Sequence, residues 1–571
     1  MKFSKQILNI ALSAGLIFAG QDKISKDLRG AAGDASVDVI IQFTQPPTER
    51  HHNKVKQRGG QLKSDLGLIR AGLYTVKAKD IEALAGDPEI TYVSPDREVH
   101  GAMEFANSAV GADIALQNGY NGNNIGVAVI DSGVMALKDL SQGSNNQTRV
   151  VYSKSFVPND NKVTDAYGHG THVAGTVGGN GYYSSGPAYT RTFRGIAPAA
   201  SIVNLRVLNS SGVGTDSAVI SAIQTAIQLK AQYNIRVINL SLGRPVFESF
   251  RTDPLCQAVE SAWKAGIVVV TAAGNEGRNN SNGTNGYATI TSPANDPLVI
   301  TVGAMNNKLT TTRADDVITS YSSKGPTLLD HIVKPDLVAP GNRIISLIAS
   351  RGLLSNKSTT VNAVPFSYYI SGAVNGTSVD YYKLSGTSMA APMVSGAAAL
   401  VLQKTPGLTP DQVKALLMKT AGKSFPSSSV ACDPVTGVCY TSQYDVFTVG
   451  AGYLDVWAAL SASDVPPAWT GAAASPTALF NSSTGKVTVV NTDSALWGDS
   501  AMWGTSAMWG TSVWLDGASA MWGTSALWGS SAMWGTSGTT GFSALWGTSA
   551  LWGTSTQTNA ESISQLINGE N

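Results

Sequence analysis

Gly386-Thr387-Ser388-Met389-Ala390-Ala391-Pro392 places a serine at the start of a run of small and apolar residues that continues to Leu402. The composition of this run predicts a buried helix that begins beside Ser388. The first backbone N–H groups of a helix have no partners within it, so they stabilise developing negative charge. Ser388 is therefore a candidate nucleophile, although an ordinary N-cap is the commoner role of a single serine at this position. A nucleophilic serine also needs a base, an orienting carboxylate and an oxyanion hole.

The sequence around this stretch predicts an α/β domain over residues 105–461. Strand-like apolar runs alternate there with segments of helical spacing, as in a parallel sheet that helices cover on both faces. The expected strands are 125–130, 202–207, 237–242, 267–272 and 298–302, and the expected helices are 219–228, 255–264 and 409–420.

Composition limits the possible partners and covalent links. The chain has 571 residues, enough for two or more domains, and a formal charge of +1, which indicates no nucleic-acid partner. Three cysteines cannot form a disulfide framework. Cys432 and Cys439 bracket a short segment and could close a small surface loop if the protein is exported, whereas Cys256 has the sequence context of a buried apolar side chain.

The first hundred residues predict a signal peptide followed by a small unit. Lys2 and Lys5 precede an apolar run at 7–18 and small residues near position 20, which is typical of a secretory signal over residues 1–20. The alternative is a buried or membrane-anchoring helix, but the run is shorter than a bilayer span of about 20 residues. Residues 36–103 predict a compact α+β unit, with strands at 37–43, 72–76 and 90–93 and helical segments at 55–66 and 81–85. Its place before a larger domain suggests a propeptide.

The C-terminal part has a different composition. Residues 462–494 are rich in Ser, Ala, Pro and Thr and predict a linker. Residues 495–555 repeat a hexapeptide of the form Ala-(Leu/Met)-Trp-Gly-Thr-Ser, and its even period favours strands or a solenoid over a helix. A tail so rich in tryptophan predicts self-packing, contact with a polysaccharide or cell surface, or a cleavable sorting segment.

Candidate partners for Ser388 occur in three other motifs. Asp131 ends an apolar strand, where catalytic groups of α/β sheets collect, although a single Asp there is often a turn former. His169 lies between two glycines just before a helix of small residues. His172 falls inside that helix and favours a structural role; a paired-His metal site is the alternative, without a nearby acidic or thiol ligand. Asn275 follows a buried strand and could donate to an oxyanion, or serve as a turn residue.

These motifs, in the order Asp131, His169, Asn275 and Ser388, resemble the subtilisin-like serine proteases, the subtilase family. Val-Ile-Asp-Ser-Gly, Gly-His-Gly-Thr-His-Val-Ala-Gly, Ala-Ala-Gly-Asn-Glu-Gly and Gly-Thr-Ser-Met-Ala-Ala-Pro all occur in full, and 334–341 is also typical of the family. The resemblance implies a subtilisin-like α/β fold over residues 105–461. It also implies that Ser388 is the nucleophile, His169 the base, Asp131 its orienting partner and Asn275 the oxyanion donor.

The resemblance also implies where an extended protein or peptide substrate binds. Two segments resemble the edges between which the peptide lies, and a third resembles the wall of the primary pocket; the pocket floor matches too poorly to indicate a preferred residue. These residues are Ser241, Leu242 and Gly243, Gly212 and Gly214, and Ala272, Ala273 and Gly274.

The resemblance makes residues 36–103 an inhibitory propeptide that occupies the cleft and is then cut off, with self-cleavage expected between about residues 100 and 107. Many relatives bind structural calcium, and Asp139 resembles a ligand if one residue is deleted before it. The usual partner loop is replaced by a different sequence at 178–183, which leaves calcium binding open. A second insertion, at 351–382, carries no readable motif.

The leading interpretation is therefore a secreted serine endopeptidase that is made as a self-inhibited zymogen. A surface-attached binding or adhesion protein on an inactive protease scaffold is the alternative, and it is disfavoured because all four catalytic positions are filled. An intracellular processing protease is disfavoured by the signal-like start.

Overall fold

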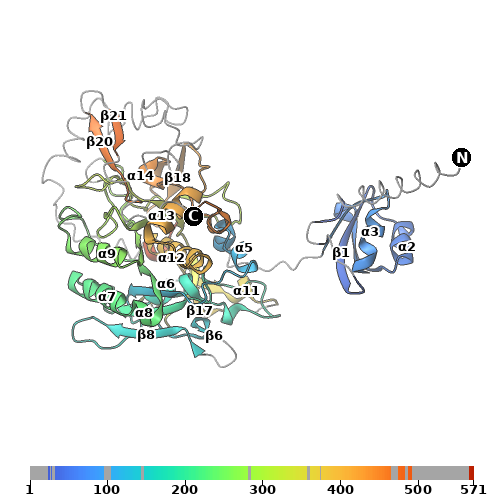
Figure 1. Cartoon of the computed structure of the whole chain (residues 1–571), viewed down its shortest axis with the longest axis horizontal. Helices are drawn as coiled ribbons and strands as arrows, with labels where there is room; N and C mark the ends of the chain where they lie inside the picture. The colour runs from blue at the N-terminus through green and yellow to red at the C-terminus, as the bar shows by residue number, and fades with distance from the viewer. Residues whose placement is uncertain are drawn as a thin grey trace. The chain divides into compact units, whose positions relative to one another are not determined.

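The computed structural model describes residues 23–25, 28, 33–95, 105–142, 147–280, 284–350, 352–356, 361–372, 375–464, 473–481, 486–490 and 565–570. The chain forms two compact units, Met1–His100 and Gly101–Asn571 (Figure 1). The predicted signal peptide at 1–20 and the hexapeptide repeat at 495–555 lie outside the described residues. Within the described residues, no helix has the length and apolar character needed to cross a membrane.

The N-terminal unit is an antiparallel sheet with two helices. Its strand order is β2-β3-β1-β4, and alternate side chains of β1, including those of Val39 and Ile41, are fully buried. The elements are β1 (Ser36–Phe43), α2 (Glu49–Gln57), β2 (Gln61–Leu66), β3 (Ala71–Lys77), α3 (Ile81–Ala85) and β4 (Ile90–Pro95).

One element of this unit differs from the prediction. The segment 55–66 was expected to be helical, but α2 ends at Gln57 and β2 begins at Gln61. The Gly59-Gly60 pair ends the helix: Gly59 has a φ of +79°, and a Cβ on Gly60 would lie 2.5 Å from the Val55 side chain. The strands at 37–43, 72–76 and 90–93 and the helix at 81–85 lie where they were predicted.

A twisted sheet of mostly parallel strands forms the centre of the second unit. Its order is β13-β12-β11-β10-β5-β9-β8, with β14 also paired to β12; only the β12–β13 pair is antiparallel. The five predicted strands correspond to β5, β9, β10, β11 and β12. The bounds are β5 (Gly126–Asp131), β8 (Val150–Ser155), β9 (Ser201–Arg206), β10 (Ile235–Leu240), β11 (Val268–Ala272), β12 (Ile300–Asn306), β13 (Val317–Ile318) and β14 (Leu337–Pro340).

Helices cover this sheet in two groups (Figure 1). The long helix α12 packs on α6 and on β10, β11, β12 and β14, while α7 and α9 pack on each other and on neighbouring strands. Side-chain caps fix where five of these helices begin, because the residue before each accepts a backbone N–H of the first turn: Thr215, Asp253, Thr409, Asp445 and Asp455. The helices are α4 (Ala106–Ala109), α5 (Ala112–Gln117), α6 (His169–Gly178), α7 (Asp216–Gln228), α8 (Lys230–Tyr233), α9 (Pro254–Lys264), α12 (Thr387–Lys404), α13 (Pro410–Thr420), α14 (Val446–Val449) and α15 (Val456–Ser461).

The insertion at 351–382, which carried no motif, contributes β16 and most of β17 to a small sheet, whose third strand β15 precedes the insertion and packs on α6. The central strand β17 pairs with β15 on one side and β16 on the other, and it leads into Gly386 and α12. The elements are β15 (Ile344–Leu347), α10 (Leu353–Asn356), β16 (Ala363–Pro365), α11 (Phe366–Tyr369) and β17 (Thr377–Leu384).

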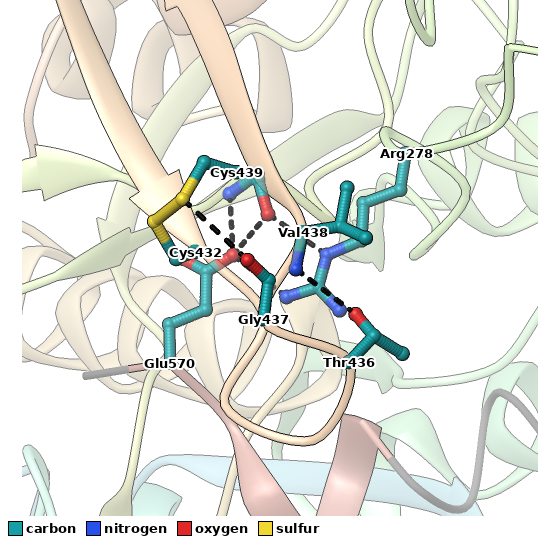
Figure 2. The surroundings of a disulfide bond; sticks show 8 residues. Arg278, Cys432, Thr436, Gly437, Val438, Cys439 and Glu570 are labelled. Carbon is teal, nitrogen blue, oxygen red and sulfur yellow. Dashed lines mark hydrogen bonds and ion pairs between the residues drawn. A yellow bond between two sulfur atoms is a disulfide. The ribbon is translucent and has the colours of Figure 1, made fainter.

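A disulfide closes a hairpin on the second unit. Cys432 and Cys439 are paired across β18 (Ser428–Cys432) and β19 (Cys439–Gln443) and form a disulfide, whereas Cys256 is free and buried. Figure 2 shows Arg278 and Glu570 beside this hairpin. Arg278 forms ion pairs with both Asp433 at the tip of the hairpin and Glu570, so the described C-terminal segment 565–570 is part of this unit.

Part of the predicted linker at 462–494 also belongs to this unit. Ala473 and Ala478 are fully buried, and Ser475 donates a hydrogen bond of 2.5 Å to the buried carboxylate of Asp336. The small side chains of Ala473, Ser475 and Ala478, which are typical of a linker, are also small enough to be buried against the core of the second unit. The segment then forms a hairpin from β20 (Thr477–Asn481) and β21 (Lys486–Val490).

Candidate active site

Asp131 occupies the carboxyl end of the central strand β5 and is almost fully buried. The strand is apolar on both faces, so the chain can place a carboxylate only where the strand ends and its last side chain meets other polar groups. One carboxylate oxygen accepts a hydrogen bond of 2.7 Å from the backbone N–H of Ser132. The backbone turns sharply at Gly133, whose φ is +113°.

His169 is the first residue of α6 and faces Asp131. Its Nδ1 lies 2.8 Å and 3.0 Å from the two carboxylate oxygens. Two glycines permit this approach: Gly168 has a φ of +105°, and a Cβ on Gly170 would lie 2.2 Å from the carbonyl oxygen of Gly133. The carboxylate holds the proton on Nδ1, which leaves Nε2 as the basic nitrogen.

The electrostatics of His169 favour its charged form. Burial by itself favours a neutral imidazole, but the charge and hydrogen bond of Asp131, together with the charge of Asp165, outweigh it and raise the pKa of His169 above its ordinary value. The site can therefore stabilise an imidazolium when His169 accepts a proton.

Asp165 organises the turn before α6 and was not identified from the sequence. Its buried carboxylate accepts hydrogen bonds from the hydroxyl of Ser132 at 2.8 Å and from the N–H groups of Gly168 at 2.6 Å and Thr171 at 2.8 Å. Burial raises its pKa, although these donors oppose the shift. An acidic residue just before a predicted helix start was the available signal, because such residues cap first-turn N–H groups.

His172 has the structural role that the sequence favoured. It is fully buried on α6, and its Nε2 lies 2.9 Å from the carbonyl oxygen of Ile344. Burial lowers its pKa to about 3. Among the described residues, no group of three or more His, Cys, Asp and Glu side chains could hold a metal ion, so the paired-His metal site has no support here.

Ser388 is the second residue of α12, which packs directly on α6. Gly386, with a φ of +154°, turns the chain into the helix, and every residue from Thr387 to Leu402 is buried. The Ser388 hydroxyl donates to the carbonyl oxygen of Ser241 at 3.2 Å. In this arrangement the hydroxyl donates to Ser241, and it must be redirected before it can donate to His169.

Asn275 lies in the loop after β11, against the turn that precedes Ser388. Its Oδ1 accepts hydrogen bonds of 3.0 Å from both the backbone N–H and the hydroxyl of Thr387. Because these donors fix the orientation of the carboxamide, its Nδ2 is the end that can donate to an oxyanion.

The residues predicted to bind substrate lie close to these groups. Ser241 follows β10 and donates from Oγ to the carbonyl oxygen of Ser388 at 2.8 Å. Gly274 is joined to Thr387 by hydrogen bonds of 3.2 Å, and Gly212 lies against the ring of Tyr167, whose ring centre is 6.3 Å from that of His169. Of the remaining predicted residues, Ala272 and Ala273 are buried, Leu242 is half-buried, and Gly214 and Gly243 are exposed.

Asp139 is buried, but its surroundings do not fit the calcium ion that the sequence left open. Its carboxylate accepts hydrogen bonds from the N–H of Tyr183 at 3.0 Å and the hydroxyl of Tyr381 at 2.8 Å. Its backbone carbonyl accepts from Arg149 and Asn180. The carboxylate and carbonyl oxygens of Asp139, which would bind a calcium ion, thus already accept hydrogen bonds from protein donors. One of these donors is the cationic side chain of Arg149.

Comparisons with known proteins agree with this geometry. Residues 122–452 match the family described as the Subtilase family. The chain is 35% identical to serine protease AprX of Bacillus subtilis (strain 168) over 402 residues, which cover 68% of this chain and 83% of that protein. It is 35% identical to subtilisin E of the same strain over 410 residues, covering 69% and 89%, and 29% identical to an alkaline protease of Shouchella clausii over 421 residues, covering 73% and 91%.

Proposed function

Because the chain belongs to the subtilase family and is a serine-type endopeptidase, we propose that Asp131, His169 and Ser388 carry out its chemistry and that it is made as a secreted, self-inhibited zymogen. The observation that carries this proposal is the Nδ1–carboxylate contact of 2.8 Å between His169 and Asp131 at the start of α6. The nucleophile begins the helix that packs against α6.

Acyl transfer follows from the positions of these groups. The Ser388 hydroxyl turns away from the carbonyl of Ser241 and gives its proton to Nε2 of His169 as Oγ attacks the substrate carbonyl carbon. Asp131 keeps the Nδ1–H tautomer and stabilises the imidazolium that forms. The imidazolium then protonates the leaving amine, and a water molecule repeats the sequence to release the acid.

Asn275 and the start of α12 supply the oxyanion site in this proposal. The Nδ2 of Asn275 and the backbone N–H of Ser388 donate to the carbonyl oxygen as it becomes negative. A side-chain donor of this kind stabilises the transition state by about 3–4 kcal/mol. The orientation that Thr387 imposes on the carboxamide supports this role, because the donor is held before substrate arrives.

The substrate is a protein or peptide bound in an extended form. We place its backbone between 241–243 and 211–214, with the small residues 272–274 lining the pocket for the side chain before the cleaved bond. Backbone pairing at both edges gives broad sequence preference, which side-chain pockets then restrict. The partial exposure of Leu242 and the exposure of Gly214 and Gly243 support an accessible edge.

Residues 36–103 act as the inhibitor of the zymogen in this proposal. The separate core and complete antiparallel sheet of the N-terminal unit support an independent inhibitory module. Residues 96–104, where most of the expected cleavage segment lies, are outside the described part of the chain.

Two serine-to-alanine variants on α12 test the catalytic proposal. Ser388→Ala should abolish hydrolysis of a denatured protein and leave the chain uncut between about residues 100 and 107. Ser395→Ala is the matched control for the loss of a buried hydroxyl from the same helix, because Ser395 donates to Asn239 at 2.8 Å and is linked to Ser388 only through Asn239 and Ser241. It should keep both activities. Wild-type turnover by purified Ser388→Ala would refute the proposal, and N-terminal sequencing would report the processing.

A further inference from the structure

One buried guanidinium binds four backbone carbonyl groups from three separate segments of the second unit. Arg149 is only 2% exposed, and its Nη1 donates to the carbonyl oxygen of Ala200 at 2.6 Å. Its Nη2 donates to the carbonyls of Asp139, at 2.8 Å, and Gly178, and its Nε donates to that of Ser141 at 3.4 Å. The three segments are the last turn of α6, the residue before β9, and the loop that carries Asp139 and Ser141.

Carbonyl and carboxylate oxygens that converge from several loops are the ligands of a hard metal cation. Arg149 supplies a positive charge at their centre, with a planar set of N–H donors that matches several acceptors at once. We propose that Arg149 is a built-in cation, which organises the loops around Asp139 in place of a structural calcium ion.

Both carboxylate oxygens of Asp139 also accept hydrogen bonds from groups of the protein itself. The N–H of Tyr183 donates to one oxygen at 3.0 Å and the hydroxyl of Tyr381 donates to the other at 2.8 Å. The segment after α6 continues this arrangement, because Asn180 donates from Nδ2 to the carbonyl of Ser141 at 2.7 Å and from its backbone N–H to that of Asp139 at 2.8 Å.

Tyr381 gives a role to the insertion that carried no motif. It lies on β17, is 1% exposed and packs edge-on against Phe193, with ring centres 4.9 Å apart. Its neighbour Tyr382 donates to the carbonyl oxygen of Gly168, the residue before His169, at 2.7 Å. The insertion thus closes the Asp139 loop with one tyrosine and supports the start of α6 with the next.

Charge balance argues against adding a divalent ion here. Burial lowers the pKa of Arg149 to about 10, against the opposing effect of the Asp139 charge, and it raises the pKa of Asp139 to about 6. The guanidinium and the buried carboxylate compensate each other. A calcium ion would add two positive charges to the same buried region and would compete with Arg149 for the same carbonyl oxygens.

Thermal unfolding of full-length protein tests the proposal, with Ser388→Ala as the background so that self-digestion does not distort the melting curve. Tm is measured in excess EDTA and in excess calcium, for the parent and for Asp139→Asn. The proposal predicts that the difference in Tm between the two buffers is the same in both proteins. A calcium-dependent gain in Tm that Asp139→Asn removes would overturn it. This arm is independent of which residue is the nucleophile.

Two substitutions of Arg149 provide the second arm. Arg149→Ala should lower Tm by about 10 °C, because several buried carbonyls and a carboxylate lose their cation. Dilute guanidinium chloride, far below denaturing concentrations, should restore part of the loss. Arg149→Met is the matched control, because its side chain fills most of the vacated space and leaves no room for guanidinium. An unchanged Tm in Arg149→Ala, or equal recovery in both variants, would contradict the role of Arg149.

Discussion

At the scale of single residues, the contact between Asp131 and His169 is the best-defined feature of the proposed chemistry. The raised pKa of His169 means that the imidazole is protonated, and unable to act as a base, over a wider range of acidic pH than a free histidine. Activity should therefore fall as the pH drops through the raised pKa. Stability depends on pH in the opposite direction. The stabilisation from charged His169 is fully present below the pKa of this histidine in the unfolded chain, and it is lost as the pH rises through the raised pKa of the folded state.

Asp131→Asn tests the origin of this behaviour. The variant keeps the size of the side chain but removes the charge that raises the pKa of His169, whereas burial, which lowers it, remains. The acid limb of the kcat/KM profile should move to lower pH, and kcat should fall by roughly 10⁴-fold because the productive tautomer is lost. An acid limb at the wild-type pH would show that Asp131 does not set the pKa of His169.

The sequence predicts catalytic roles for Asp131, His169, Asn275 and Ser388 because each lies in a motif at one end of a buried element, and the structure places Asp131 against His169. It did not identify Arg149 or Asp165. A buried arginine has the same local sequence signature as an exposed one, and the carbonyl groups that Arg149 binds come from distant segments. The place of Asp165 before a helix could have marked it as a cap, but its contact with the Ser132 hydroxyl joins distant parts of the chain and has no local signal.

At the scale of secondary-structure elements, the start of α6 decides whether His169 faces Asp131. Gly170 allows α6 to begin against the turn at Gly133, since an added Cβ would lie 2.2 Å from that carbonyl oxygen and 3.1 Å from the Asp131 side chain. The helix and the strand β5 are therefore in contact at Asp131 and His169.

Gly170→Ala should displace the start of α6. We expect a loss of stability of about 1–3 kcal/mol from overpacking and a fall in kcat of about 10²-fold from misplacement of His169. Urea unfolding and steady-state kinetics measure the two effects. Gly407→Ala is the control, because a Cβ there meets no atom within 4 Å. Equal kinetics in the two variants would contradict the importance of this close approach.

Some strands and helices could be predicted from the sequence and others could not. Strands such as β5, β10 and β11 are buried on both faces and read as continuous apolar runs. β8 is an edge strand with alternating exposure, and β13 has two residues, so neither gave such a run. The prediction of a helix at 55–66 was wrong because the Gly59-Gly60 pair ends the helix, and the polar residues after it form the strand β2.

At the scale of the whole molecule, the catalytic unit extends beyond the predicted end at residue 461. A buried network around Asp336 joins β14 to α13 and to the segment after residue 472: Lys334 lies 2.7 Å and Lys414 3.1 Å from its carboxylate, which Ser475 also contacts at 2.5 Å. Burial opposes the charge of Asp336, but the two lysines lower its pKa overall. Sequence composition could not reveal this docking, because Ala, Ser and Pro are typical of linkers and of tightly packed surfaces alike.

Two truncated chains test this boundary. A chain that ends at Ser461 should have a Tm about 5–10 °C below that of a chain that ends at Val490, because it loses the buried Ala473 and Ala478 and the hydrogen bond of Ser475 to a buried charge. Both chains lack the segment 565–570, so their difference reports residues 462–490 alone. Equal Tm values for the two chains would show that residues 462–490 do not stabilise the folded unit, as expected of a linker. The hexapeptide repeat, outside the described residues, keeps its sequence-based prediction of self-packing or surface attachment.

Covalent labelling of the nucleophile tests the central claim most directly. Processed enzyme is treated with a fluorophosphonate, which reacts with serines activated by a neighbouring base, and the modified peptide is mapped by mass spectrometry. We predict one label per molecule, on Ser388, with none in Ser388→Ala and a strongly slowed reaction in His169→Ala. A label on another residue, or equal labelling of the His169→Ala variant, would contradict the proposed catalytic triad.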